Sequence, residues 1–113
     1  MAVIAILTNL PDSESAFNLA RTLVERRLAA CVNVFGPVTS FYRWENVLQQ
    51  ASEVPILIKS TAELYPELEH AIRQAHPYTL PEIVAFPVAA GLDQYLEWVA
   101  AECKLPTAIA SAP

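Results

Sequence analysis

Glycine, cysteine and basic residues are all scarce in this chain of 113 residues. It has two glycines, two cysteines and seven lysines or arginines. Two glycines cannot build a glycine-rich phosphate loop, and the sequence contains neither a G-x-S-x-G nor an H-E-x-x-H motif. Cys31 and Cys103 stand far apart, which excludes a zinc ribbon and a C-x-x-C redox pair. We therefore predict a protein that is not an enzyme and that keeps two reduced thiols.

Long apolar runs are also absent, and the net charge is −5. Nucleic acid binding needs a surface of lysine and arginine, which a few dispersed basic residues do not provide. No run approaches the roughly 18 apolar residues of a membrane helix. The N-terminal segment MAVIAILTN lacks the basic flank and the cleavage site of a signal peptide. We expect a cytoplasmic protein that binds neither nucleic acid nor membrane.

Apolar residues, in contrast, are abundant. They make up 54% of the chain, while charged residues make up only 17%. A domain of this size has a modest interior, so part of its apolar surface requires burial between subunits. The composition therefore predicts a homo-oligomer, and it gives no subunit number.

The start of the chain predicts a strand followed by a helix. Residues 2–8 form an almost continuous apolar run, which is typical of a strand buried on both faces. Asp12 or Ser13 is placed to cap the helix that follows. The apolar stripe of that helix is formed by Ala16, Ala20, Leu23, Val24 and Leu28.

Two further strands are predicted over residues 31–44 and 47–61. Both segments are rich in β-branched and aromatic residues. The Glu-Asn pair at residues 45–46 fits a tight turn between them, because asparagine tolerates a positive φ. The Gly-Pro pair at residues 36–37 interrupts the first strand as a bulge or bend. Pro55 indicates that part of the second strand lies at an edge or a bulge.

The remainder of the chain predicts a helix, a short strand and a last helix. The stripe of the first helix is Leu64, Leu68, Ile72 and Ala75. This helix ends at His76, because a residue that precedes proline avoids the α region. Residues 81–88 form the strand. Gly91 precedes the last helix, whose inward side chains are expected to be Leu92, Tyr95, Leu96 and Val99.

The resulting β-α-β-β-α-β-α order predicts an α+β fold: a ferredoxin-like βαββαβ sandwich with an extra C-terminal helix. We place one domain over residues 1–105 and a flexible tail over residues 106–113. In this topology the first two strands run parallel and the last two run in the opposite direction. Cys31 and Lys59 then lie at one end of the sheet, and Asn9, His76 and Glu82 lie at the other. One chain cannot bring Cys31 and His76 together, whereas a site shared between subunits can.

Each candidate residue has a functional and a purely structural interpretation. His76 with Glu82 offers the nitrogen and oxygen donors of a metal site, but a histidine at a helix end also bonds backbone carbonyls. Cys31 is either a soft copper ligand or a small buried thiol. Lys59 either anchors an anion or extends its ammonium group into solvent. Glu45, Glu53 and Glu63 are interpreted as solvated charges.

Several segments, taken together, resemble one known family. They are LARTLVERRLAACVNVFGPVTSFYRW, EVPILIKST, YPELEHAIRQAHPYTLPEIVAFPV and GLDQYLEWV. From about residue 4 to residue 99 the chain resembles the CutA divalent-cation-tolerance family. The resemblance implies a homotrimer of ferredoxin-like subunits, paired edge to edge, with weak or non-obligatory binding of a divalent cation, above all Cu²⁺. It implies no established enzymatic reaction.

Carried over position by position, the resemblance implies two sets of site residues near subunit clefts. The metal ligands are Cys31, His76 and Glu82, and the remaining ligand-binding positions are Trp44, Lys59, Tyr78 and Trp98. The chain departs from the family at the hairpin, where WENV replaces W-E-G-K and LQQAS replaces an acidic run. The loss of those carboxylates implies weaker cation binding. The alternative function is a PII-like signalling or interaction scaffold that binds a small anion or a partner protein at the clefts.

Overall fold

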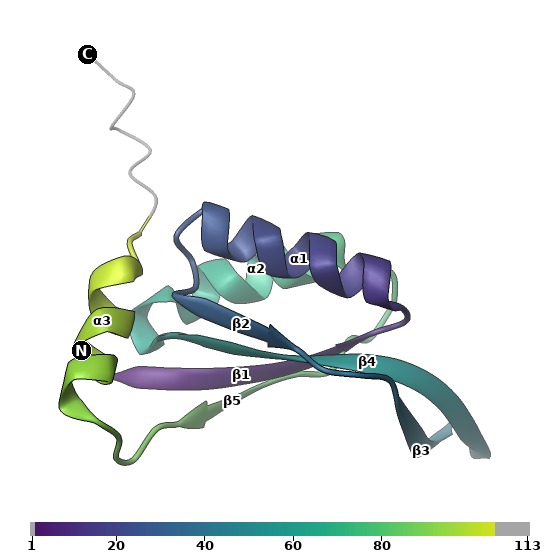
Figure 1. Ribbon diagram of the computed structural model, residues 1–113. Helices are drawn as coiled ribbons and strands as arrows, with labels where there is room; N and C mark the ends of the chain where they lie inside the picture. The colour runs from purple at the N-terminus through teal and green to yellow at the C-terminus, as the bar shows by residue number, and fades with distance from the viewer. Residues whose placement is uncertain (1, 106–113) are drawn as a thin grey trace.

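An antiparallel sheet with two helices on one face forms the fold (Figure 1). The computed structural model describes residues 2–105. The elements are β1 (Val3–Leu10), α1 (Ser13–Glu25), β2 (Cys31–Val34), β3 (Val38–Trp44), β4 (Val47–Thr61), a 3-10 turn (Ala62–Leu64), α2 (Tyr65–Ala75), β5 (Ile83–Pro87) and α3 (Asp93–Glu102). The strand order is β2-β4-β1-β5. This order confirms the ferredoxin-like α+β fold with an added C-terminal helix. The expected flexible tail lies outside the described residues.

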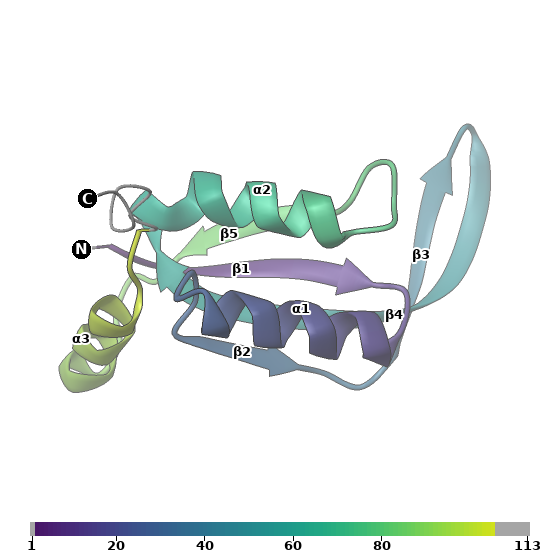
Figure 2. The same cartoon turned by 90° about the horizontal axis from the view of Figure 1, so that it is seen from above.

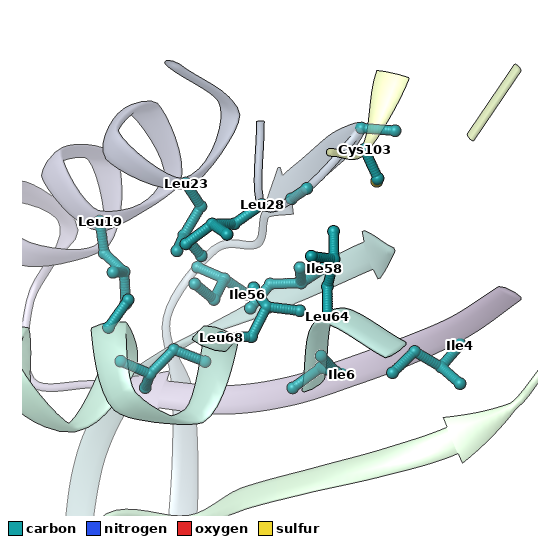
Figure 3. Close-up of a cluster of buried hydrophobic side chains, with 14 of the residues drawn as sticks. Ile4, Ile6, Leu19, Leu23, Leu28, Ile56, Ile58, Leu64, Leu68 and Cys103 are labelled. Atoms are coloured by element: carbon teal, nitrogen blue, oxygen red, sulfur yellow. The ribbon is translucent and has the colours of Figure 1, made fainter. Parts of the chain in front are cut away.

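The pairing of β1 with β4 places one row of side chains from each strand beneath α1 and α2. Ile6 lies opposite Ile58 in this pairing, and both side chains are fully buried. Leu23 of α1 and Leu68 of α2 belong to the same buried cluster (Figure 3). Burying one such side chain stabilises the fold by roughly 1.5–3 kcal/mol. The core therefore lies between the sheet and these two helices.

The opposite face of the sheet is not covered by a helix within residues 2–105 (Figure 1). Ala5 and Leu7, which point to that face from β1, are only half-buried. The prediction that β1 is buried on both faces is therefore wrong for the single chain. The reason is the position of α3, which lies at one end of the sheet instead of across its open face (Figures 1 and 2).

Helix α1 begins with a side-chain cap. The backbone N–H of Ser15 donates a hydrogen bond of 2.8 Å to Oδ1 of Asp12, which confirms the predicted cap. Leu19 and Leu23 point into the core, but Val24 is 42% exposed. The expectation that Val24 faces inward is wrong, because one residue beyond Leu23 lies about 100° further around a helix of 3.6 residues per turn.

The hairpin between β3 and β4 forms as the sequence predicts. Glu45 and Asn46 have φ values of 50° and 66°, the left-handed conformations that a two-residue hairpin turn requires. Strands β2 and β3 both pair with β4, and the break between them lies beside Pro55. The carbonyl of Pro55 accepts a hydrogen bond of 3.0 Å from the N–H of Phe35 in that break. Pro55 thus lies in a central strand, at the point where the neighbouring strand changes.

Helix α2 has the irregular start that Pro66 indicates. A 3-10 turn precedes it, and the proline lies in its first turn, where the missing N–H costs no helical hydrogen bond. Leu68 and Ile72 are buried, whereas Ala75 at the end of the predicted stripe is exposed. The helix ends at His76, which has an extended conformation with ψ of 131°. Pro77 explains this ending.

Helix α3 differs most from its prediction. Leu92 is 71% exposed and Tyr95 is 39% exposed, and Val99 is the buried residue of the helix. The expectation that Leu92 and Tyr95 face inward is therefore wrong for the single chain, since α3 packs mainly on β1 and β4 at one end of the sheet (Figures 1 and 2). No helix in the described part of the chain is long and apolar enough to cross a membrane.

The chain after α3 is attached to the loop that follows α1. The N–H of Lys104 donates to the carbonyl of Arg27 at 2.9 Å. The side chain of Arg27 also pairs with Glu102 at 3.4 Å. Cys103 is buried, and its Sγ lies 3.6 Å from Oγ of Ser60. These contacts hold the C-terminal end of α3 against the loop after α1 and the end of β4.

Leu23→Ala and Val24→Ala should have unequal effects on stability. Leu23 is fully buried, so its truncation leaves a cavity and should cost roughly 2–5 kcal/mol. Val24 is the matched control on the same helix and should cost less than about 1 kcal/mol. Urea unfolding followed by circular dichroism measures both. Equal losses would contradict the orientation of α1 described above.

Candidate binding sites at the two ends of the sheet

The sheet separates the seven candidate residues into two groups. Cys31 is the register partner of Lys59, at the end of the sheet where α3 lies. His76 and Glu82 lie at the other end, beside Asn9 at the end of β1. In Figure 2 the start of β2 lies near α3, while the end of α2 and the β3–β4 hairpin lie at the opposite side. This arrangement confirms that one chain does not bring Cys31 and His76 together.

At the α3 end, a thiol and an ammonium group are neighbours. Nζ of Lys59 lies 3.9 Å from Sγ of Cys31, and it also donates a short hydrogen bond to Oδ1 of Asn33. Burial, followed by the nearby Cys31 thiol, raises the pKa of Tyr95. The Tyr95 and Trp98 rings lie 5.6 Å apart, centroid to centroid. Sequence reasoning missed Asn33 as a member of this group, although it lies two residues after Cys31 and thus on the same face of β2.

At the hairpin end, His76 is buried and hydrogen-bonded at both ring nitrogens. Nδ1 accepts a bond of 3.3 Å from the N–H of Tyr78. Nε2 lies 2.5 Å from the carbonyl oxygen of Asn9 and therefore carries the ring proton. The bond runs to a carbonyl of β1 and joins the end of α2 to the end of that strand. In this conformation neither nitrogen is available to a metal, so the ligand role of His76 stays a prediction.

Two carboxylates lie near His76 in different surroundings. Glu82 is exposed, and its Oε1 accepts a hydrogen bond of 3.0 Å from the side chain of Asn9. Glu53 is only 9% exposed, so its interpretation as a solvated charge is wrong. It lies where β4 leaves the main sheet, and it is close to Tyr78. Burial is the main cause that raises the pKa of Tyr78, and the adjacent Glu53 carboxylate raises it further.

A groove of ≈ 1020 Å³ opens between the hairpin and the segment of residues 77–84. Aromatic side chains form its walls, and Glu53, Glu82 and Asn9 provide its polar groups. The lining residues are Asn9, Ser40, Phe41, Tyr42, Trp44, Glu53, Pro77, Tyr78, Thr79, Leu80, Pro81, Glu82, Ile83 and Val84. Trp44, Tyr78 and Glu82, three of the predicted site residues, thus share one surface.

The donor groups of one chain do not fit a complete metal site. Within residues 2–105 no three His, Cys, Asp or Glu side chains come close enough to hold one metal ion. The Lys59 ammonium group beside Cys31 also opposes a divalent cation at that thiol. Residues 2–105 of one chain therefore do not bring three such donor side chains together.

The comparisons with known proteins agree on one family. The model of the CutA1 divalent ion tolerance protein family matches residues 4–102. The chain belongs to this CutA1 family. The match covers all the strands and helices described above except the first residue of β1.

Individual CutA1 relatives support the same assignment. The divalent-cation tolerance protein CutA of Thermus thermophilus is 44% identical over 94 residues, which are 83% of this chain and 91% of that protein. Protein CutA of Mus musculus is 41% identical over 98 residues, 87% of this chain but only 55% of the longer mouse protein. The solved structure of the Thermus thermophilus protein superposes with a TM-score of 0.89 and 40% sequence identity, and the match covers 90% of this chain and 99% of that one.

Glu53→Gln should lower the pKa of Tyr78 towards its ordinary value of 10.0 without reaching it. The carboxylate is removed, but burial remains as the larger cause. An NMR titration of labelled tyrosine measures the change. Tyr65, whose pKa is raised by burial and by Glu69, is the internal control and should not move. An unchanged Tyr78 would contradict the proximity of Glu53.

The raised pKa of Tyr78 also has a consequence for stability at alkaline pH. A group whose pKa is higher in the folded state contributes stability that is fully present below its unfolded pKa, here 10.0. That contribution is lost as the pH rises through the folded value. Tyr78→Phe should therefore lose less stability than the parent above pH 10.0, as measured by thermal unfolding across that range.

Proposed function

We propose that this CutA1-family chain acts as a homotrimeric, non-catalytic protein of divalent-cation tolerance that binds Cu²⁺ or a similar ion between subunits. A relative that is 44% identical is named for divalent-cation tolerance. One observation carries the placement of the ion: Cys31 and Glu82 lie at opposite ends of the sheet, and residues 2–105 of one chain contain no complete donor set. Contact between two subunits is the arrangement that brings such donors together.

Exposed apolar side chains and free strand edges support the assembly. Within the described residues β5 pairs only with β1, and β3 pairs only with β4, so each has an unpaired edge. The hairpin and β5 carry several large exposed hydrophobic residues, which are Val38, Phe41, Tyr42, Trp44, Val47, Leu48, Val84 and Phe86. Their burial in edge-to-edge contacts would also account for the high apolar content of the chain.

The donor types favour copper and low affinity. A thiol, an imidazole and a carboxylate form a site with sulfur, nitrogen and oxygen donors. The affinity of such a site for the common divalent ions is generally highest for Cu²⁺. Three features reduce the affinity for the ion. The Lys59 ammonium group lies beside Cys31, and the ring nitrogens of His76 are already hydrogen-bonded. Gln49 and Gln50 also stand on the hairpin where the family resemblance implies carboxylates. The metal is therefore proposed as a weak, non-obligatory ligand. The family match gives no support to the PII-like alternative.

Titration of Cu²⁺ and Zn²⁺ into metal-free protein by calorimetry, with the mass in solution measured alongside, tests this function. The parent should show saturable Cu²⁺ binding and the mass of a trimer. Cys31→Ser should weaken Cu²⁺ binding roughly tenfold or more, because a hydroxyl is a much poorer copper ligand than a thiolate. His76→Ala is less informative, since it also breaks the hydrogen bond to Asn9.

Cys103→Ser is the matched control for Cys31→Ser. Cys103 is buried beneath the C-terminal end of α3, and burial raises the pKa of its thiol. A buried, protonated thiol is a poor metal ligand. The Cys103 variant should therefore bind Cu²⁺ like the parent. Absence of saturable binding in the parent, or equal loss in both variants, would contradict the proposal.

A further inference from the structure

Cys31 and Lys59 present a thiol and an amine to each other across two neighbouring strands. The two residues are partners in the pairing of β2 with β4, so their side chains stand on the same face of the sheet. Nζ of Lys59 lies 3.9 Å from Sγ of Cys31. The stem of a lysine is long and flexible, so rotation of its bonds alone can bring the two atoms together. Neither strand has to move.

Asn33 keeps the amine at this face of the sheet. It follows Cys31 by two positions in β2, and its Oδ1 accepts a hydrogen bond from Nζ of Lys59. The ion pair found within residues 2–105 joins Arg27 to Glu102, so no carboxylate among these residues pairs with the Lys59 ammonium group. The nitrogen therefore stands beside the sulfur without a counter-ion from the described part of the chain.

The second thiol of the chain lies on the other face of the sheet. Lys59 and Ser60 are consecutive in β4, so their side chains point to opposite faces. Sγ of Cys103 lies 3.6 Å from Oγ of Ser60 and belongs to the buried cluster on the helix side (Figure 3). The sheet therefore separates Cys103 from Cys31, and the nucleophile beside an oxidised Cys31 is an amine instead of a second thiol.

We propose that Cys31 and Lys59 form a reversible sulfur–nitrogen crosslink when the protein meets hydrogen peroxide. The thiolate of Cys31 attacks one peroxide oxygen and breaks the O–O bond, which gives a sulfenic acid and a hydroxide ion. The neutral amine of Lys59 then attacks that sulfur, so the S–N bond forms and the S–O bond breaks. The departing hydroxide takes a proton from the nitrogen. In total, a thiol, an amine and one peroxide give a sulfenamide and two molecules of water.

The crosslink needs neither a metal ion nor a second chain. Both reacting groups belong to one chain and both are half-buried, and hydrogen peroxide is little larger than water. The reaction therefore stands or falls separately from the function proposed above. It ties the edge strand β2 to the central strand β4. Two thiols of a reductant reverse it, because the first attacks the Cys31 sulfur and releases the amine, and the second completes the reductant's disulfide.

Mass spectrometry of the full-length protein, reduced and then exposed to hydrogen peroxide in the assembly that it forms in solution, tests the crosslink. The mass of the denatured chain should fall by two hydrogens. A crosslinked Lys59 no longer directs cleavage by trypsin, so the peptide of residues 28–43 should be joined to that of residues 44–73. Dithiothreitol added before trypsin should restore the separate peptides 28–43, 44–59 and 60–73.

Three variants identify the two reacting groups. Lys59→Arg keeps the positive charge but removes the primary amine, so its sulfenic acid should persist and label with dimedone roughly fivefold more than the parent. Cys31→Ser should form no crosslink. Cys103→Ser is the matched control, because it removes the thiol on the other face of the sheet, and it should form the crosslink like the parent.

Four results would overturn the inference. The first is a Cys31 that stays a free thiol under peroxide that oxidises glutathione in the same solution. The second is a Cys31 peptide that gains oxygen while trypsin still cleaves after Lys59. The third is equal dimedone labelling of the parent and Lys59→Arg. The fourth is a denatured mass of two chains, which would assign the oxidised sulfur to a disulfide between subunits.

Discussion

The antiparallel pairing of β1 with β4 is the constraint on which the rest of the structure depends. It places Ile6 opposite Ile58 and so selects which face of the sheet α1 and α2 cover. A slip of one residue would turn every buried side chain of β1 to the open face. The same register places Asn9 opposite Pro55, where the neighbour of β4 changes, and it thereby locates the groove next to the end of β1.

Asn9 has a larger role than its ordinary position at a strand end suggests. Its carbonyl accepts the hydrogen bond from His76, and its side chain donates to Glu82. Both partners come from the segment that contains Pro77 and Pro81, so one strand residue fixes the proline-rich segment at two points. This explains why a histidine and a glutamate lie among prolines here: the prolines restrict the backbone, and Asn9 fixes the side chains.

Local patterns in the sequence were sufficient for most elements of the fold. The stripes of α1 and α2, the cap at Asp12 and the turn at residues 45–46 depend on neighbours along the chain. Apart from Val24 and Ala75 in the two stripes, each formed as predicted. The predicted strand directions also placed Cys31 and His76 at opposite ends of the sheet, as the structure has them. Features that depend on distant contacts were missed. Glu53 is buried and lies close to Tyr78, which is 25 positions away in the sequence, and the exposure of α3 depends on where that helix docks.

The candidate site shows the same division. Residue types alone gave two interpretations for His76. The contact that favours one ring tautomer comes from a carbonyl 67 positions away in the sequence. No local pattern indicates such a partner. Trp44 and Tyr78 were predicted as separate binding positions, but their place on one groove depends on how β3 and β4 extend beyond the main sheet.

The continuity of β4 has a mechanical consequence. The strand is 15 residues long, and its residues 47–53 extend beyond the main sheet with β3 beside them. Seven residues at about 3.3 Å each make an arm of roughly 23 Å. The arm joins the core at Glu53 and Val54 and contains little packing of its own, so its direction is set at that junction. A rotation of about 10° at this junction moves the tip of the hairpin by roughly 4 Å. A small change in backbone direction beside the groove therefore produces a large displacement at the tip.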